Sequence, residues 1–235
     1  MLKAIFIHSF GIAKFLKLLK RKLYKKYLFH LKIWMIKICI TCLVILFTLQ
    51  QVKASEFDFK DPKGVNNIIF QMDAPLESIN GSGDEISGTV SFDPAQPEET
   101  KGTIILNSKS LHVGNPVLKE HMHGIDWLNV EKFKQIKFQL TKLHNIKKEK
   151  NEIHAVAKGK MTIRNITIEM NVPVKLTYLK GLLEKRNRTP GDLLILRSKF
   201  KVKRDDFDIQ KGKNLEKVAN DIEISLNLAG AFPYN

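Results

Sequence analysis

The sequence predicts an all-β domain, an eight-stranded antiparallel barrel with one short helical insertion. Apolar and polar residues alternate in eight short segments, which is the period of a strand with one buried face. The alternation is clearest over residues 168–178, where every second side chain is apolar and those between are mostly polar. Because a sheet with many open edges is prone to aggregate, closure into a barrel is the expected arrangement.

Turn-forming residues separate most of the predicted strands. The strands are expected at residues 66–72, 86–92, 103–107, 136–140, 152–158, 168–178, 195–202 and 222–228, and the alternation of the fifth continues to residue 163. Turns are expected at Gly81-Ser82-Gly83, Asp93-Pro94, residues 147–151, Pro190-Gly191 and Gly212. Short strands joined by local turns indicate antiparallel pairing.

The one long interruption lies between residues 107 and 136. Gly114, Asn115 and Pro116 are adjacent turn formers, and residues 117–133 have helix-like periodicity. Gly124 weakens a helix at that point, so two short helical turns are as well supported as one continuous helix. The insertion is therefore expected to be helical, and a strand resumes at Ile136.

The positive charge of the chain is concentrated at its beginning. The whole sequence has 39 Lys and Arg against 24 Asp and Glu, a net charge of +15. Eleven of the basic residues and no acidic residue fall in positions 1–54, so the rest of the chain has a net charge of only +4. A mildly basic domain with interspersed signs does not indicate a nucleic-acid partner.

Residues 1–54 have the layout of a basic leader followed by a secretory signal peptide. An apolar run at residues 38–49 follows Lys37 and precedes Val52-Lys53-Ala54, which predicts cleavage after Ala54 and a barrel domain at residues 55–235. The domain is then periplasmic or secreted, or membrane-anchored if the run is not cleaved. Two interpretations of residues 1–34 are open. Either translation starts at Met35 and these residues are not part of the protein, or they form a basic arm on an anionic membrane surface.

Five blocks of sequence resemble a known family. One runs from Ser110-Leu111 through Gly114-Asn115 and His121-Met122 to the Asp-Trp-Leu-Asn-Val-Glu-Lys-Phe run at residues 126–133. The others include Ile-Ser-Gly-Thr-Val-Ser-Phe-Asp-Pro at 86–94, Gly-Lys-Met-Thr-Ile at 159–163 with Ile166-Thr167, and Lys-Arg-Asp-Asp-Phe at 203–207. In these blocks the chain resembles the YceI-like family of periplasmic lipid-binding proteins.

The resemblance implies a lipocalin-like barrel that binds a long isoprenoid chain, such as a polyprenyl lipid or the tail of a quinone. It implies sequestration of that lipid without a reaction, so no enzyme activity and no cofactor beyond a bound isoprenoid or quinone are expected. Contact with a membrane would be transient. The sequence leaves the oligomeric state open, a dimer included.

The apolar faces of the predicted strands supply the candidate cavity lining, because alternate residues of a barrel strand point inward. The candidates are Val90, Phe92, Leu106, Ile136, Phe138, Leu140, Met161, Ile163, Met170, Val172, Phe200, Val202, Ile224 and Leu226. Met122, Trp127 and Leu128 in the insertion are either core residues or a lid over the cavity mouth.

A second hypothesis is a periplasmic metal or redox enzyme. His112, His121 and His123 are close in sequence, and imidazoles are common metal ligands, although no carboxylate or cysteine spacing completes a set. The favoured interpretation is structural, with no metal site. Arg204, beside Asp205, is expected to form a structural ion pair or to contact a lipid headgroup.

Overall fold

The computed structural model describes residues 34, 35, 37 and 54–234. The predicted leader and signal peptide lie almost entirely outside the described residues, so cleavage after Ala54 stays a prediction. Within the part of the chain that the structure describes, no helix has both the length and the apolar character of a membrane span.

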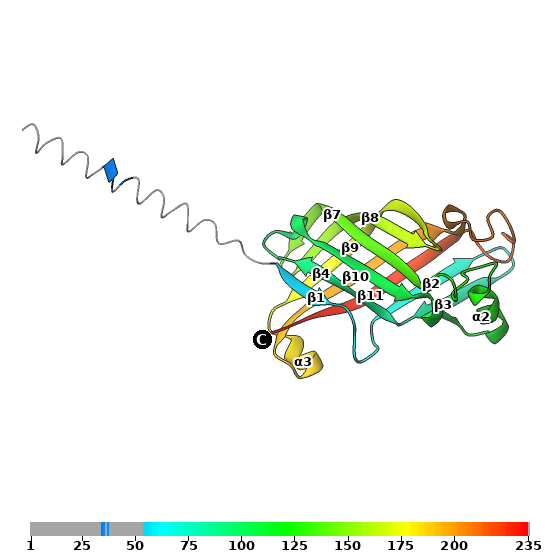
Figure 1. The fold of residues 1–235 in the computed structure, drawn as a ribbon, viewed down its shortest axis with the longest axis horizontal. Coiled ribbons are helices and arrows are strands. Elements are labelled where there is room, and N and C mark those ends of the chain that lie inside the picture. Colours follow the sequence, from blue (N-terminus) through cyan, green and yellow to red (C-terminus); the bar gives the residue numbers. More distant parts are fainter. Residues whose placement is uncertain (1–33, 36, 38–53, 235) are drawn as a thin grey trace, which may run out of the picture. The chain divides into compact units, whose positions relative to one another are not determined.

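Eight antiparallel strands form a closed ring, which confirms the predicted fold class (Figure 1). The ring closes because β1 pairs with β4 on one side and with β11 on the other. Its members are β1 (Ser55–Asp58), β4 (Ile86–Phe92), β5 (Lys101–Asn107), β7 (Gln135–Glu149), β8 (Glu152–Ile163), β9 (Ile166–Leu179), β10 (Gly191–Lys203) and β11 (Asp221–Pro233).

Strand β11 divides its free edge between two partners. Its second half reaches β1 at Ala231, opposite Asp58, and its first half pairs with β2 (Asn67–Asp73), where Ile224 lies opposite Phe70. Strand β2 continues into β3 (Ser78–Gly83) and the two-residue β6 (His112–Val113). The predicted strand at 66–72 therefore exists, but the four-residue β1 closes the ring in its place.

The predicted turn at Gly81-Ser82-Gly83 was wrong, because these residues belong to β3. Gly81 lies directly opposite Phe70 on β2, and the phenyl ring of Phe70 lies over it. A Cβ atom at this position would overlap that ring and the carbonyl oxygen of His112. The glycine thus provides space for an aromatic ring within a strand, which is a tertiary requirement that local turn propensity does not report.

The insertion is a short helix, α2 (Pro116–His123). The side chain of Asn115 caps its amino end by accepting a hydrogen bond from the Leu118 backbone N–H at 3.1 Å, and Pro116 occupies the first turn. The helix ends at Gly124, so it covers only the first part of the predicted helical segment, residues 117–133. A second helix, α3 (Leu183–Asn187), and the 3₁₀ turns η1 (Pro97–Glu99), η2 (Ser108–Ser110) and η3 (Arg204–Phe207) were not predicted.

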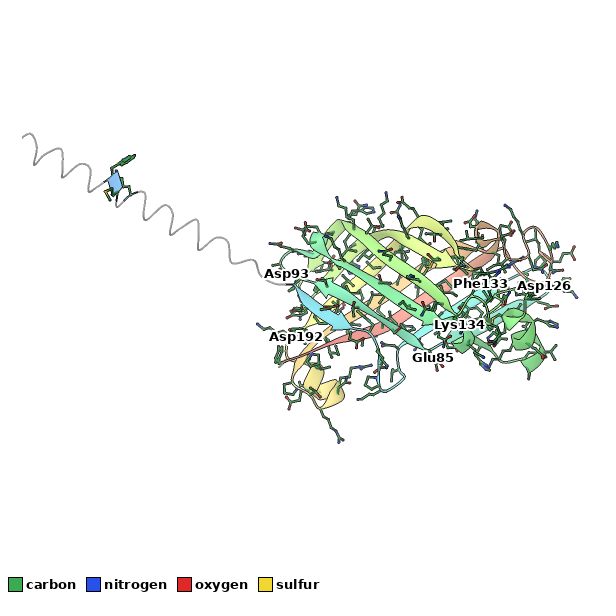
Figure 2. All side chains as sticks on the ribbon, viewed as in Figure 1. Glu85, Asp93, Asp126, Phe133, Lys134 and Asp192 are labelled. Atoms are coloured by element: carbon green, nitrogen blue, oxygen red, sulfur yellow. The ribbon has the colours of Figure 1, made fainter. Side chains whose placement is uncertain are left out.

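One end of the barrel is sealed by aromatic rings around a buried carboxylate. The hydroxyl of Tyr178 donates to Asp192 at 2.7 Å, and the Tyr234 hydroxyl and the Gly181 N–H donate to the same carboxylate. Burial acts to raise the pKa of Asp192, but these hydrogen bonds outweigh it and hold the pKa below its usual value. Figure 2 shows Asp93 and Asp192 at this closed end, and Asp126, Phe133 and Lys134 at the opposite end.

Helix α3 is attached to the loop between β1 and β2 by one ion pair. The guanidinium of Arg186 donates to both carboxylate oxygens of Asp61, at 3.0 and 2.8 Å. The Asp61 side chain is only 2% exposed. Burial opposes its ionisation, but the hydrogen bonds from Arg186 and from the N–H groups of Val65 and Lys63 lower its pKa from 3.8 to about 2.

We expect Gly81→Ala to lower the free energy of unfolding by about 1–3 kcal/mol, because the new methyl group forces the Phe70 ring or strand β6 to move. Gly114→Ala is the matched control: no atom lies within 4 Å of a Cβ placed there. It should change stability by less than about 0.5 kcal/mol. Urea unfolding of both variants measures this, and equal effects would contradict the packing role of Gly81.

The Asp61–Arg186 pair should make stability depend on pH in acid. Because the folded pKa of Asp61, about 2, lies below its ordinary value of 3.8, its contribution is complete above about pH 4 and is lost as pH falls toward 2. Asp61→Asn should therefore be less stable at neutral pH, by on the order of 2 kcal/mol. Urea unfolding at several pH values should show the difference from wild type shrinking in acid, and a constant difference would contradict this account.

Candidate functional site

Two apolar cavities lie inside the barrel. The larger, here called the outer compartment, has a volume of about 130 Å³ and lies at the end covered by α2. The smaller, the inner compartment, has a volume of about 70 Å³ and is lined mainly by β7, β8, β9 and β10. A well-packed domain contains few voids larger than a water molecule. Two apolar cavities in one barrel are therefore the feature that a candidate site must explain.

Most of the predicted lining residues border these cavities. The outer compartment is lined by Leu106, Ile136, Met161, Ile163, Phe200, Val202 and Ile224 of that set, and by all three predicted mouth residues, Met122, Trp127 and Leu128. The inner compartment is lined by Val90, Phe138, Leu140 and Val172, and again by Met161 and Phe200. The structure thus brings together side chains from strands far apart in sequence.

Three predicted lining residues border neither cavity. Phe92 is 1% exposed and packs edge-on against Phe57 in the sealed end, with their ring centroids 6.3 Å apart. Met170 and Leu226 are half-buried and pack against the core. Strand parity correctly indicates an inward direction for all three, but it does not say at which depth along the barrel a cavity lies.

Sequence reasoning missed several lining residues. The sequence could have indicated four of them, because each lies on the same face of its strand as a predicted lining residue. These four are Ala157, Val174, Leu176 and Leu196. Leu111, Arg204 and Ile209 had no such indication because they lie in aperiodic segments. The missed residues are Ile68, Phe70, Met72, Leu111, Arg204, Ile209 and Ile222 in the outer compartment, and Thr100, Leu143, Ala157, Val174, Leu176 and Leu196 in the inner one.

Among the residues that the structure describes, Arg204 is the only charged side chain that lines the outer compartment, and it is 2% exposed. Its guanidinium donates five hydrogen bonds, all to backbone carbonyl oxygens of the loop that follows η3. The acceptors belong to Ile209, Gln210, Lys213, Val218 and Ala219, at 2.8–3.1 Å. Burial lowers the pKa of Arg204, and the nearby Asp205 carboxylate partly opposes that shift.

The expected role of Arg204 as an ion pair or a headgroup contact was therefore wrong. An arginine has five N–H donors, and here each finds a carbonyl acceptor, so none is left for a ligand. Its role is to fix the path of residues 205–219 over the barrel. The guanidinium carbon also lies 5.5 Å from the ring centroid of Trp127, within cation–π range, so Arg204 joins this loop to the segment after α2.

Further contacts connect the segments that cover the outer compartment. The side chain of Gln210 donates to the carbonyl of Asp126 at 3.1 Å, and the Leu76 N–H donates to the carbonyl of Glu216 at 2.9 Å. Arg164, in the turn between β8 and β9, donates to the carbonyl of Asp208 at 2.8 Å. The cover of the mouth is thus a set of loops held by polar contacts on the outside of an apolar space.

The three predicted histidines do not build a metal centre. The ring Nε2 of His123 lies 2.7 Å from the carbonyl oxygen of Leu111, and His112 lies on β6, outside α2. Over residues 54–234 and the three described leader positions, the structure contains no group of three or more His, Cys, Asp or Glu side chains arranged to hold a metal ion. His123 thus contributes a contact between α2 and the chain before it.

Arg204→Lys should loosen the mouth loop. A lysine has three donors on one nitrogen and cannot reach five carbonyls, so buried acceptors stay unpaired, and we expect a loss of at least about 2 kcal/mol in unfolding free energy. Arg197→Lys is the control, since the side chain of Arg197 is exposed and donates to two carbonyls only. Limited proteolysis should cut Arg204→Lys faster within residues 205–219, and an unchanged cleavage pattern would contradict this role.

Comparison with known proteins identifies the family. The family model of the YceI-like domain matches residues 54–229. Protein YceI from Salmonella newport (strain SL254) is 27% identical over 134 residues, which cover 56% of this chain and 67% of that protein.

Two solved structures share the barrel. BcnA from Burkholderia cenocepacia superposes with a TM-score of 0.55 at 20% identity, covering 70% of this chain and 94% of that one. A polyisoprenoid binding domain from Saccharophagus degradans also has a TM-score of 0.55, at 8% identity, covering 77% of this chain and all of that domain. These likenesses support the fold, and the match of the family model over residues 54–229 shows that the chain belongs to the YceI-like domain family.

Proposed function

We propose that this protein is an exported lipid-binding protein that sequesters or carries a long isoprenoid chain, such as a polyprenyl lipid or the tail of a quinone, in its barrel. The observation that carries the proposal is the outer compartment, whose lining is apolar except for an arginine with no free donor. Family membership supports it, and so does the likeness to a barrel described as a polyisoprenoid binding domain.

The chemistry of the site fits an apolar chain better than a polar ligand. A polar group placed in the compartment would lose its hydrogen bonds to water and find no partner, whereas each buried methylene group gains about 0.8 kcal/mol. The predicted lining residues that border the two compartments, with Met122, Trp127 and Leu128 at the mouth, are the proposed contacts. The barrel holds the chain and catalyses no reaction on it.

The proposal includes a route for the ligand. The end near Asp192 is closed by buried aromatic rings, so the chain enters past the segments that cover the outer compartment. Met122, Trp127 and Leu128 are only half-buried there, and methionine adapts readily to irregular apolar partners. A transient contact with a membrane would deliver the lipid to this end of an exported protein.

The metal or redox enzyme hypothesis has less support. A metal centre built on the histidines needs at least three ligands close together, and the described part of the chain offers no such group. His123 is already in contact with the carbonyl of Leu111. No observation favours this second function over lipid binding.

Two adjacent residues of β7 test the proposal. Ile136 lines the outer compartment, and Lys137 points to the other face of the strand. Ile136→Glu puts an unpaired carboxylate into the cavity, where burial costs several kcal/mol, so lipid binding should be lost. Lys137→Glu should leave it unchanged.

The measurement is mass spectrometry of lipid extracted from each purified protein, with rebinding of a polyprenyl alcohol to delipidated samples. Circular dichroism establishes that each variant is folded. Wild-type protein that neither carries nor rebinds an isoprenoid would refute the proposal, and so would a folded Ile136→Glu variant that binds as wild type does.

A further inference from the structure

The two compartments are separated by a thin layer of side chains. Within residues 54–234, only Met161 and Phe200 line both of them. On β8, Ile163 lines the outer compartment and Ala157 the inner one, with Met161 between them. On β10, Phe200 lies between Val202, which lines the outer compartment, and Leu196, which lines the inner one. The interior is therefore one apolar column interrupted at a single level.

The residues at this level are less firmly held than ordinary core residues. A side chain with empty space on both sides lacks partner atoms there, so it forfeits part of the dispersion energy that fixes a packed residue. Methionine has three rotatable side-chain bonds and changes shape at low cost. Phe200 is half-buried, and its next inward neighbour along β10 is the small Ser198. Both side chains therefore have room to move aside.

The outer compartment is too small to hold a whole isoprenoid chain. Its 130 Å³ is close to the volume of an engineered cavity of about 150 Å³ that holds one benzene molecule. Only the end of an isoprenoid chain fits in such a space. Because the far end of the barrel is sealed around Asp192, additional length inside the barrel has to pass the level of Met161 and Phe200.

We propose that Met161 and Phe200 form an internal gate that sets how long a chain the barrel accepts. With the gate closed, only the outer compartment is filled. When a longer chain displaces these two side chains, the compartments merge and the chain reaches Phe138, Leu140 and Val172. The inference rests on the proposed lipid-binding function and adds to it the residues that determine chain length.

A series of linear prenyl alcohols, from geraniol through farnesol to geranylgeraniol and solanesol, tests the gate in the full chain. Trp127 lines the outer compartment, so its emission reports binding. In wild type, affinity should rise with length and then level off where the chain meets the gate. Met161→Ala and Phe200→Leu should move that break to longer alcohols and improve their binding at least about tenfold.

Phe232→Leu is the matched control for Phe200→Leu, since it makes the same change at the sealed end, where Phe232 packs against Phe57 and borders neither compartment. It should keep the wild-type break. Melting curves establish that each variant is folded, and Phe200→Leu keeps an apolar side chain in case a larger truncation unfolds the barrel.

The outcomes separate the gate from the function. If wild type binds no prenyl alcohol, the lipid-binding function fails and the gate fails with it. If wild type binds but affinity varies smoothly with length, or if Phe200→Leu and Phe232→Leu behave alike, the gate is refuted while lipid binding stands. A break that moves in both gate variants and not in the control supports the gate.

Discussion

The width of an eight-stranded ring fixes how much space its inward side chains have to fill, and the rest of this structure depends on how they fill it. Strand β8 supplies small side chains at its inward positions, among them Ala155 and Ala157. At Gly159 a Cβ atom would lie 2.5 Å from the Phe138 ring, so that glycine provides space for the ring rather than filling space itself. Beyond this run of small residues, Met161 is the first large inward side chain of β8, and it borders both cavities. The layer between the two cavities therefore lies where the inward side chains of this strand change from small to large.

The two ends of the barrel are closed by different chemistry. At one end aromatic rings enclose Asp192, whose hydrogen bonds from Tyr178 and Tyr234 are all internal. At the other end loops cross the opening, and Arg204 holds them through their backbone carbonyls instead of through an apolar core. The contacts that join these loops to neighbouring segments, Gln210 with Asp126 and Arg164 with Asp208, lie at the surface. Such contacts are exchanged with water at modest net cost, whereas a buried aromatic cluster is not. This difference is why the covered end, and not the sealed one, is the candidate entrance.

The sequence was sufficient for the fold class and for much of the site, because period-two alternation records directly which face of a strand is buried. The sequence also located the helical insertion, because Asn115 caps the amino end of α2 and Gly124 lies at its carboxyl end. Both effects depend only on residues that are close together in the sequence. The sequence did not reveal β1, where Phe57 is the one buried residue and no alternation develops. Nor did it reveal that Gly81 makes room for the Phe70 ring of the neighbouring strand. The role of Arg204 depends on carbonyls in an aperiodic loop. Each missed feature arises from contacts between segments, which local patterns do not encode.

The pairing of β1 with β11 also constrains the order in which the molecule can assemble. These are the first and last strands of the barrel, so the ring closes only through contacts between residues at opposite ends of the domain. Such contacts carry a large loop-closure entropy and make folding slow. The hairpins of β7, β8 and β9 are local and can form early, but they present open edges until β11 arrives. A chain delivered from its amino terminus therefore stays an incomplete sheet until its whole length is available.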